Sequence, residues 1–242
     1  MQKIVLLVIN FFDYFHKIKI INFLKKNNKS FEILIDVGAH IGETIELFSK
    51  NFFIKKIYSF EASPINYELL KKKEKKFIKI NKYTEIVLEN MALGANNTTK
   101  TFKQFNESSS STFKKIDKNS KYFKKKFKLL NYFSKEDAYY EFDIRVQKLE
   151  DYIVHKNLTR IDFLKIDTEG YEYEILLGLG NKISLVKILM FEHHYDNMII
   201  KNYTFTDINN FLKMNNFNQI YKSKMPFRKT FEYIYKREEL IN

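Results

Sequence analysis

Hydrophobic positions in this chain follow two alternating patterns from residue 31 onward. Residues 31–35 form a short, nearly continuous apolar run, as expected for a strand buried on both faces of a parallel sheet. Ile41, Ile45 and Phe48 then recur at the spacing of one face of a helix. Because strands alternate with helices along the chain, the pattern predicts a parallel sheet with right-handed crossovers.

The same two patterns predict the other elements. Strands are expected at 57–60, 86–88, 161–166, 186–191, 217–221 and 230–235, and helices near 63, over 171–179 and from 206. Ser63 is expected to cap the helix that starts there, with Pro64 at its first position.

Two segments fall outside this alternation. Residues 1–30 contain an apolar run at 4–9 with no small-residue cleavage site after it, so we expect an N-terminal helical segment ahead of a main domain over 31–242. Residues 100–141 are rich in Lys, Phe and Tyr and are too long for a plain connection. We expect this second segment to be an inserted cap or lid over the ligand site.

Composition narrows the class of protein. The 242 residues include no cysteine, which excludes a disulfide scaffold, a thiolate zinc site and a cysteine nucleophile. Lys and Arg outnumber the acids by 42 to 29, yet only Arg145, Arg160, Arg228 and Arg237 are arginines. Specific nucleic-acid recognition relies on arginine, and the lysines share A/T-rich codons with the abundant Asn, Ile and Phe. We therefore do not expect a nucleic-acid partner.

Four predicted strands end on a carboxylate: those of Asp36, Glu61, Asp167 and Glu192. The carboxyl ends of parallel strands meet at one edge of the sheet, which is where ligands bind in such folds. The acids are therefore expected to surround one ligand site, with Asp36 and Glu61 sharing a cavity.

A glycine loop follows the first predicted strand, in the sequence Asp36-Val37-Gly38-Ala39-His40-Ile41-Gly42. Gly38 permits a tight turn and Gly42 lets the next helix start close to the sheet. The loop does not have the G-x-G-x-x-G pattern of dinucleotide-binding loops. The acid at its start suits a cofactor with a cationic amino-acid end better than a cofactor with a pyrophosphate. Glu61 stands where a carboxylate would accept hydrogen bonds from ribose hydroxyls. Together these features favour S-adenosyl-L-methionine over a nicotinamide cofactor.

A series of ordered motifs resembles the FkbM-type methyltransferases. They are Asp36–Gly42, Phe60–Pro64, Asn90–Gly94, Lys148–Tyr152 and Phe163–Gly170, within a resemblance that spans residues 31–236. It implies a class I, Rossmann-like α/β fold with a seven-stranded, mostly parallel sheet, helices on both faces and an antiparallel last strand. It also implies an S-adenosylmethionine-dependent O-methyltransferase acting on a hydroxyl of a sugar, glycan or glycosylated small molecule. His40 and Glu150 replace the commoner Asn and Asp, and segment 100–141 is longer than the usual connection.

Roles for individual residues follow as hypotheses. The loop residues Asp36, Gly38, His40 and Gly42 are expected to hold the methionine part of the cofactor, Glu61 its ribose, and Met91 and Ala92 its adenine. A hydroxyl is a poor nucleophile, so a general base would help. The candidates are Asp167, Glu169, His193 and His194. Adjacent strand residues face opposite sides of a sheet, so at most one of the two histidines can reach the site.

Several alternatives remain open from the sequence. Asp167, Glu192 and His193 would suit Mg²⁺, but acids at strand ends are expected in a cofactor site in any case, so we expect no metal. A second function is an RNA or protein methyltransferase that docks through the basic segment 100–141, a third is a noncatalytic binding module, and a fourth is a nicotinamide oxidoreductase. We expect a cytoplasmic protein without a transmembrane span, and peripheral membrane contact stays open.

Overall fold

A computed structural model describes residues 2–105, 111–130 and 139–238. Its first half contains α1 (Gln2–Asn27), β1 (Ser30–Val37), α2 (Glu43–Asn51), β2 (Phe53–Phe60), α3 (Pro64–Lys72), α4 (Glu74–Ile80), β3 (Glu85–Glu89), β4 (Ala92–Leu93), β5 (Thr98–Phe105), β6 (Lys115–Ile116) and α5 (Lys121–Leu130). Its second half contains β7 (Tyr139–Gln147), α6 (Leu149–His155), β8 (Ile161–Ile166), α7 (Glu172–Leu177), a 3₁₀ helix (Gly180–Leu185), β9 (Val186–His194), β10 (Ile199–Ile200), α8 (Phe205–Met214), β11 (Phe217–Lys224) and β12 (Thr230–Arg237).

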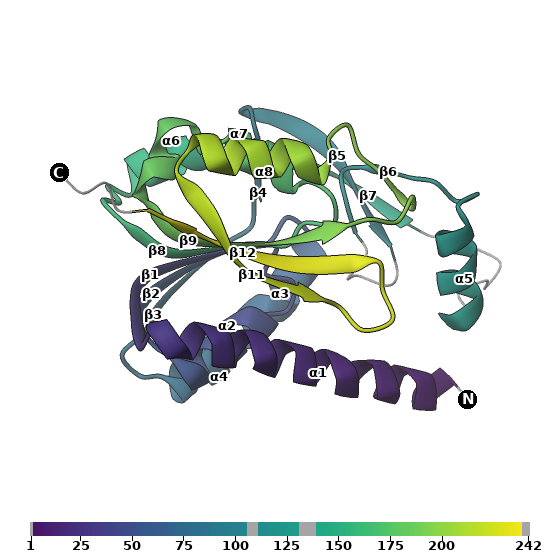
Figure 1. Cartoon of the computed structure of the whole chain (residues 1–242), viewed down its shortest axis with the longest axis horizontal. Helices are drawn as coiled ribbons and strands as arrows, with labels where there is room; N and C mark the ends of the chain where they lie inside the picture. The colour runs from purple at the N-terminus through teal and green to yellow at the C-terminus, as the bar shows by residue number, and fades with distance from the viewer. Residues whose placement is uncertain (1, 106–110, 131–138, 239–242) are drawn as a thin grey trace.

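The main sheet has seven strands in the order β11-β12-β9-β8-β1-β2-β3. Pairing is parallel from β9 through β8, β1 and β2 to β3, whereas β12 runs antiparallel to both β9 and β11. Helices α6, α7 and α8 cover one face, and α1 to α4 cover the other (Figure 1). The predicted seven-stranded, mostly parallel sheet with an antiparallel last strand is therefore confirmed.

Strand β8 is the middle strand of the main sheet, and every one of its residues is buried. Its side chains alternate between two cores: Leu164 packs toward the face of α6 to α8, and Phe163 packs against Phe31 and Phe48 on the other face. Each such fully buried apolar side chain contributes about 2 kcal/mol through removal from water. This packing fixes the register of β8, and with it the position of the residues that follow the strand.

The helix after β2 begins as the sequence predicts. Ser63 is its N-cap and accepts a hydrogen bond at Oγ from the backbone N–H of Asn66, at 3.1 Å, and Pro64 opens the helix. The cap holds the β2–α3 junction, where Glu61 lies, in one conformation.

Helix α1 packs onto the same sheet as the rest of the chain. Ile20, Ile21 and Leu24 enter the core beside α2 and α4. Nearer its start, His16 Nε2 lies 2.6 Å from Oε2 of Glu232 on β12. Among the residues that the structure describes, no helix has both the length and the apolar character needed to cross a bilayer. The C-terminal part of α1 thus contributes to the main domain's core.

Segment 100–141 contains regular structure that its sequence does not predict. Strands β5 and β7 pair antiparallel along their length, and β4 joins them in a separate three-stranded sheet. The short strand β6 pairs with β10, and α5 lies at that end of the molecule (Figure 1). Residues 106–110 and 131–138 of the segment lie outside the described residues. Its role as a lid stays a prediction.

Candidate functional site

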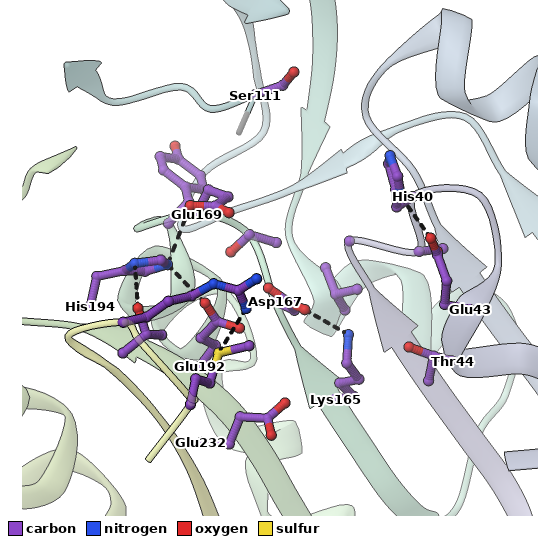
Figure 2. A pocket seen from close by; sticks show the side chains of 18 of the residues that line it. His40, Glu43, Thr44, Ser111, Lys165, Asp167, Glu169, Glu192, His194 and Glu232 are labelled. Atoms are coloured by element: carbon purple, nitrogen blue, oxygen red, sulfur yellow. Dashed lines mark hydrogen bonds and ion pairs between the residues drawn. The ribbon is translucent and has the colours of Figure 1, made fainter. Parts of the chain in front are cut away.

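A cavity of about 900 Å³ opens at the carboxyl ends of β1, β2, β8 and β9. This volume is at the upper end of the range for small-molecule sites, about 300–1,000 Å³. Figure 2 shows that its side chains come from both sides of the sheet's edge, with His40 and Glu43 on one side and Glu169 and His194 on the other. The parallel strands thus bring together residues that are far apart in the sequence.

The glycine loop forms one wall of the cavity through Gly38 and His40. Gly38 has φ +84°, and a Cβ there would lie 1.8 Å from the backbone oxygen of Asp167, so no side chain fits. Gly42 has φ +89° and faces the ring of Phe77 on α4 rather than the cavity. Gly42 therefore shapes the start of α2, and of the two glycines only Gly38 lines the cavity.

Glu61 faces the cavity at the end of β2. Its Oε2 accepts a hydrogen bond from the backbone N–H of His40 at 2.7 Å, and its Oε1 accepts one from Ser63 at 2.9 Å. Burial outweighs these hydrogen bonds and raises the pKa of Glu61 to about 7. Met91 and Ala92, which follow β3, line the same cavity. The structure thus brings the expected ribose and adenine residues to one place.

Asp36 does not reach this cavity, which corrects our expectation that it shares the cavity with Glu61. Strand β1 continues to Val37, so Asp36 is still inside the strand, with a side chain that is 0% exposed. Its Oδ1 lies 3.5 Å from Nζ of Lys165 on β8. Burial raises the pKa of Asp36 despite the charge of Lys165. Asp36 can therefore affect the site only indirectly, through the charge and position of Lys165.

Lys165 links Asp36 to Asp167, and the sequence analysis missed it. Its Nζ lies 3.1 Å from Oδ2 of Asp167, and both Lys165 and Asp167 line the cavity. Burial opposes the charge of Lys165, but the two carboxylates outweigh it and raise the pKa of the ammonium. In the same way Lys165 lowers the pKa of Asp167 against the effect of burial. A lysine inside a mostly apolar strand, two residues before an acid, was the available signal.

The two histidines at the end of β9 face opposite sides. His193 packs among Tyr195, Tyr203 and Phe205, and does not line the cavity. Burial lowers its pKa to about 3. His194 lines the cavity. His193 as a candidate base, or as a metal ligand beside Asp167, is therefore wrong, because strand alternation turns it into the aromatic core.

His194 lies among carboxylates. Its Nε2 is 3.2 Å from Oε2 of Glu169 and 3.0 Å from Oε1 of Glu192 (Figure 2). Its Nδ1 lies near Oδ2 of Asp196 and Oγ1 of Thr230. Burial lowers the pKa of His194, but the three carboxylates outweigh burial and raise the pKa well above its usual value. Glu192 has a raised pKa because of burial and of the nearby charge of Asp167. A dense group of acidic oxygens therefore surrounds one imidazole.

The cavity is also lined by residues that no sequence motif indicated. Asp13 and Lys17 of α1 line it, as do Arg228 and Glu232 from the end of the chain. Arg228 donates a hydrogen bond from Nη2 to Oδ2 of Asp13 at 2.7 Å, which ties α1 to the β11–β12 connection. Contacts between residues about 215 positions apart leave no local pattern in the sequence.

Comparison with known protein families decides the identity of this site. The model of the methyltransferase FkbM domain matches residues 36–219, which include the glycine loop, Glu61 and the β8 and β9 ends. The chain belongs to the FkbM methyltransferase family. This domain is that of S-adenosylmethionine-dependent methyltransferases, and the match argues against the noncatalytic module and the nicotinamide oxidoreductase as alternatives. No curated protein matches the chain.

Solved structures show the same fold at low identity. The FkbM methyltransferase from Methylobacillus flagellatus is 16% identical with a TM-score of 0.57, and the match covers 86% of this chain and 44% of that longer one. Magnesium protoporphyrin IX methyltransferase from Synechocystis, with S-adenosylhomocysteine bound, is 9% identical with a TM-score of 0.53, covering 95% and 85%. TrmK from M. capricolum, also with S-adenosylhomocysteine, is 12% identical with a TM-score of 0.50, covering 90% and 68%. This FkbM methyltransferase therefore has the class I fold.

Proposed function

We propose that this FkbM methyltransferase transfers the methyl group of S-adenosylmethionine to a hydroxyl oxygen of a sugar, glycan or glycosylated small molecule. The observation that carries the proposal is the group of Asp167, Glu169, Glu192 and His194, which faces the same cavity as Glu61. Ionised carboxylates can only accept hydrogen bonds. The carboxylate oxygens of this group are therefore complementary to a substrate with many hydroxyl groups, which can donate hydrogen bonds to them.

The residues around Glu61 fit the cofactor. Each oxygen of Glu61 accepts one backbone N–H, and a carboxylate has about four acceptor positions, so capacity remains for ribose hydroxyls. Met91 and Ala92 would lie against the adenine, and the backbone of Gly38 and His40 against the methionine part. Asp36 has no direct part in this arrangement.

Positioning and proton removal would be the protein's tasks in the reaction. S-adenosylmethionine supplies a methyl group on a sulfonium, which is already a good leaving group. Asp167, held by Lys165, fixes the end of β8 beside the reacting atoms. Asp167 and Glu169, which both line the cavity, are the carboxylates that can receive the proton of the hydroxyl. Alignment of oxygen and methyl, with water excluded, supplies most of the acceleration.

Aromatic rings in the same cavity support a sugar-sized acceptor. Phe102, Phe113 and Tyr171 line the cavity, with ring centroids 4.9 Å apart between Phe102 and Phe113 and 5.1 Å between Phe113 and Tyr171. Apolar ring faces beside hydrogen-bonding groups are typical of sites that bind a small molecule in one orientation. Phe102 and Phe113 belong to segment 100–141, so this segment would shape acceptor specificity.

A second candidate, methylation of RNA, has one observation in its favour. Lys121 and Lys125 of α5 line the cavity and carry the positive charge that a phosphate backbone would need. The acidic residues beside His194 oppose it, because they would repel phosphates near the methyl group. We therefore treat RNA as an outcome of the test.

The experiment follows a labelled methyl group. S-adenosylmethionine with a tritiated methyl is incubated with the protein and separate fractions of small glycosides, polysaccharide, RNA and protein. We expect label in a glycoside or polysaccharide fraction that survives mild alkali, because methyl ethers resist hydrolysis that removes methyl esters. The variant Asp167→Asn should lose transfer, and His193→Phe should keep it. Label only in RNA or protein would overturn the proposal.

A further inference from the structure

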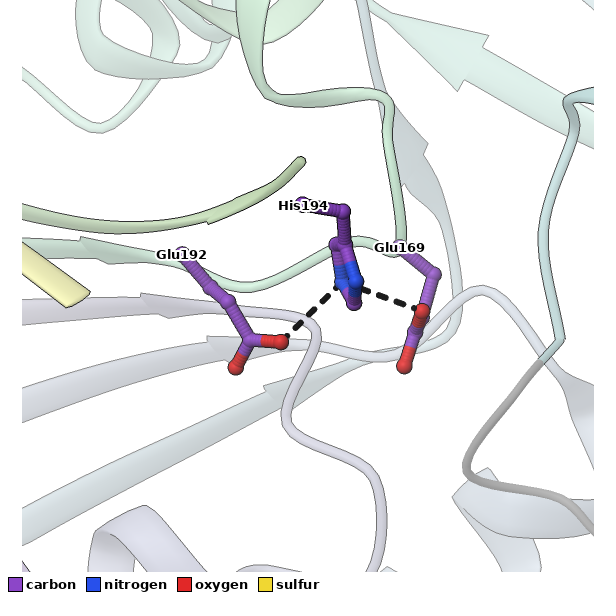
Figure 3. A group of neighbouring side chains, drawn as sticks. All are labelled: Glu169, Glu192 and His194. Atoms are coloured by element: carbon purple, nitrogen blue, oxygen red, sulfur yellow. Dashed lines mark ion pairs between the residues drawn. The ribbon is translucent and has the colours of Figure 1, made fainter. Parts of the chain in front are cut away.

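Glu169, Glu192 and His194 form a group of possible metal ligands at the acceptor side of the cavity. One ligand atom from each residue lies within 4.8 Å of the other two (Figure 3). The group combines two strand residues on one face of β9 with a third residue from the loop after β8. It differs from the set Asp167, Glu192 and His193 that was weighed from the sequence, because His194 replaces His193 and Glu169 replaces Asp167.

Two of the three spacings within this group match a coordination sphere, and the third is below 4.8 Å. Nε2 of His194 lies 3.2 Å from Oε2 of Glu169 and 3.0 Å from Oε1 of Glu192. With a metal–ligand distance of about 2.1 Å, neighbouring ligands lie about 3.0 Å apart in an octahedron and about 3.4 Å apart in a tetrahedron. A single cation could therefore contact all three residues with small side-chain adjustments.

The orientation of His194 supplies an independent observation. The residue is only 8% exposed, and its Nε2 is buried without making a hydrogen bond, although the two carboxylates are close. Its Nδ1 lies 3.2 Å from Oγ1 of Thr230 and 3.6 Å from Oδ2 of Asp196. Metal-bound histidines commonly have such a partner behind the second nitrogen, which fixes the ring and leaves the first nitrogen's lone pair for the metal.

Asp196 is itself held in place for this role. Its Oδ1 accepts a hydrogen bond from the backbone N–H of Met198 at 2.9 Å, so the carboxylate cannot turn freely toward the cavity. The backbone oxygen of His194 also accepts a hydrogen bond from Nζ of Lys201. His194 is therefore held in place both through its backbone oxygen and through Nδ1 of its ring.

We propose that Glu169, Glu192 and His194 bind one divalent cation with an affinity for mixed oxygen and nitrogen ligands, such as Mn²⁺ or Zn²⁺. Carboxylates suit Mn²⁺ and imidazole suits Zn²⁺, whereas an all-oxygen set would have favoured Mg²⁺ or Ca²⁺. Three protein ligands leave coordination positions open to the cavity. The cation's role rests on the proposed function: it would hold the acceptor's hydroxyl oxygen and lower the pKa of that hydroxyl, and with Glu169 and His194 bound to the metal the proton would pass to Asp167 in the same cavity.

The test measures metal binding directly. Chelator-treated protein is titrated with Mn²⁺, and free Mn²⁺ is followed by electron paramagnetic resonance, with Zn²⁺, Mg²⁺ and Ca²⁺ as competitors. We expect one Mn²⁺ per chain, displaced by Zn²⁺ far better than by Mg²⁺ or Ca²⁺. Glu169→Gln and His194→Gln should each weaken binding more than tenfold. The matched control Glu46→Gln removes a surface carboxylate of α2 that pairs with Lys50, and it should not change binding.

Folding and function are separated from metal binding in the same experiment. Binding of S-adenosylhomocysteine by each variant shows that it is folded. Asp196→Asn acts as a positioning variant, and it should weaken Mn²⁺ binding about tenfold or more without removing a ligand. Absence of stoichiometric Mn²⁺ and Zn²⁺ binding, or binding that survives in both ligand variants, overturns the proposal. Metal binding without transfer to any hydroxyl would instead overturn the proposed function, and metal-independent transfer would leave that function intact.

Discussion

Nζ of Lys165 lies 3.5 Å from Oδ1 of Asp36, so a buried ion pair joins the two central strands of the sheet. Asp36 is completely buried, and its carboxylate oxygens make no hydrogen bond. The same ammonium reaches Asp167 at the edge of the cavity. One lysine therefore balances two acids, one that is buried inside the sheet and one that faces the cavity.

Removing this lysine should destabilise the protein strongly. Lys165→Met leaves the carboxylates of Asp36 and Asp167 close together without a cation, and loss of one partner of a buried pair typically costs about 3–5 kcal/mol. We expect the free energy of unfolding, measured with urea, to fall by about 3 kcal/mol. Adding Asp36→Asn to the variant should restore part of the loss. A loss below about 1 kcal/mol would show that the ion pair does not support the sheet.

The pKa of His193 predicts an acid sensitivity unrelated to catalysis. Its folded-state pKa of about 3 lies below the unfolded value of about 6.5, so the unfolded state binds more protons and stability falls as the pH drops below about 6.5. Between pH 7.5 and 5.5 this one residue should remove about 1.4 kcal/mol. His193→Phe should be less acid-sensitive by that amount in urea unfolding. An unchanged pH dependence would place the imidazole in contact with water.

Glu61 predicts a pH dependence of cofactor binding. Its pKa is about 7 and its ionised form is the better acceptor for ribose hydroxyls, so affinity for S-adenosylhomocysteine should rise with pH. From pH 6 to pH 8 the ionised fraction of such a group changes about tenfold. Calorimetry should show a comparable gain for wild type and none for Glu61→Gln. Equal gains in both proteins would mean that another group is responsible.

The two loop glycines should respond differently to substitution. Gly38→Ala places a Cβ against the backbone oxygen of Asp167 at 1.8 Å and must displace the end of β8. Gly42→Ala meets the rings and methyls of Phe77 and Leu70 on the far side of the loop. Both variants lose stability because both glycines have positive φ. We expect only Gly38→Ala to weaken S-adenosylhomocysteine binding more than tenfold, and equal weakening in both would contradict the distinction.

Local pattern in the sequence was enough to predict the main sheet. Apolar runs and helical spacing define β1, β2, β8 and β9, and Ser63 with Pro64 marks a helix start. The antiparallel pair of β5 and β7 was missed because the lysines and aromatic residues of this segment follow no clear period. For such segments, pairing between distant strands decides the structure and leaves little local signal.

The candidate site could be predicted only in part. Strand-end acids identified Glu61, Asp167 and Glu192, because parallel strands bring their ends together. Asp36 was misplaced, since one further strand residue turns its side chain away from the cavity. The choice between His193 and His194 needed the exact register of β9, which periodicity does not supply.

The most direct test of the account is a crystal structure of the protein with S-adenosylhomocysteine. We expect the ribose hydroxyls within hydrogen-bond distance of the Glu61 carboxylate, the adenine beside Met91 and Ala92, and the sulfur directed toward Asp167. Binding of the ligand at another place, or a ribose without contact to Glu61, would contradict the assignment of this cavity as the cofactor site.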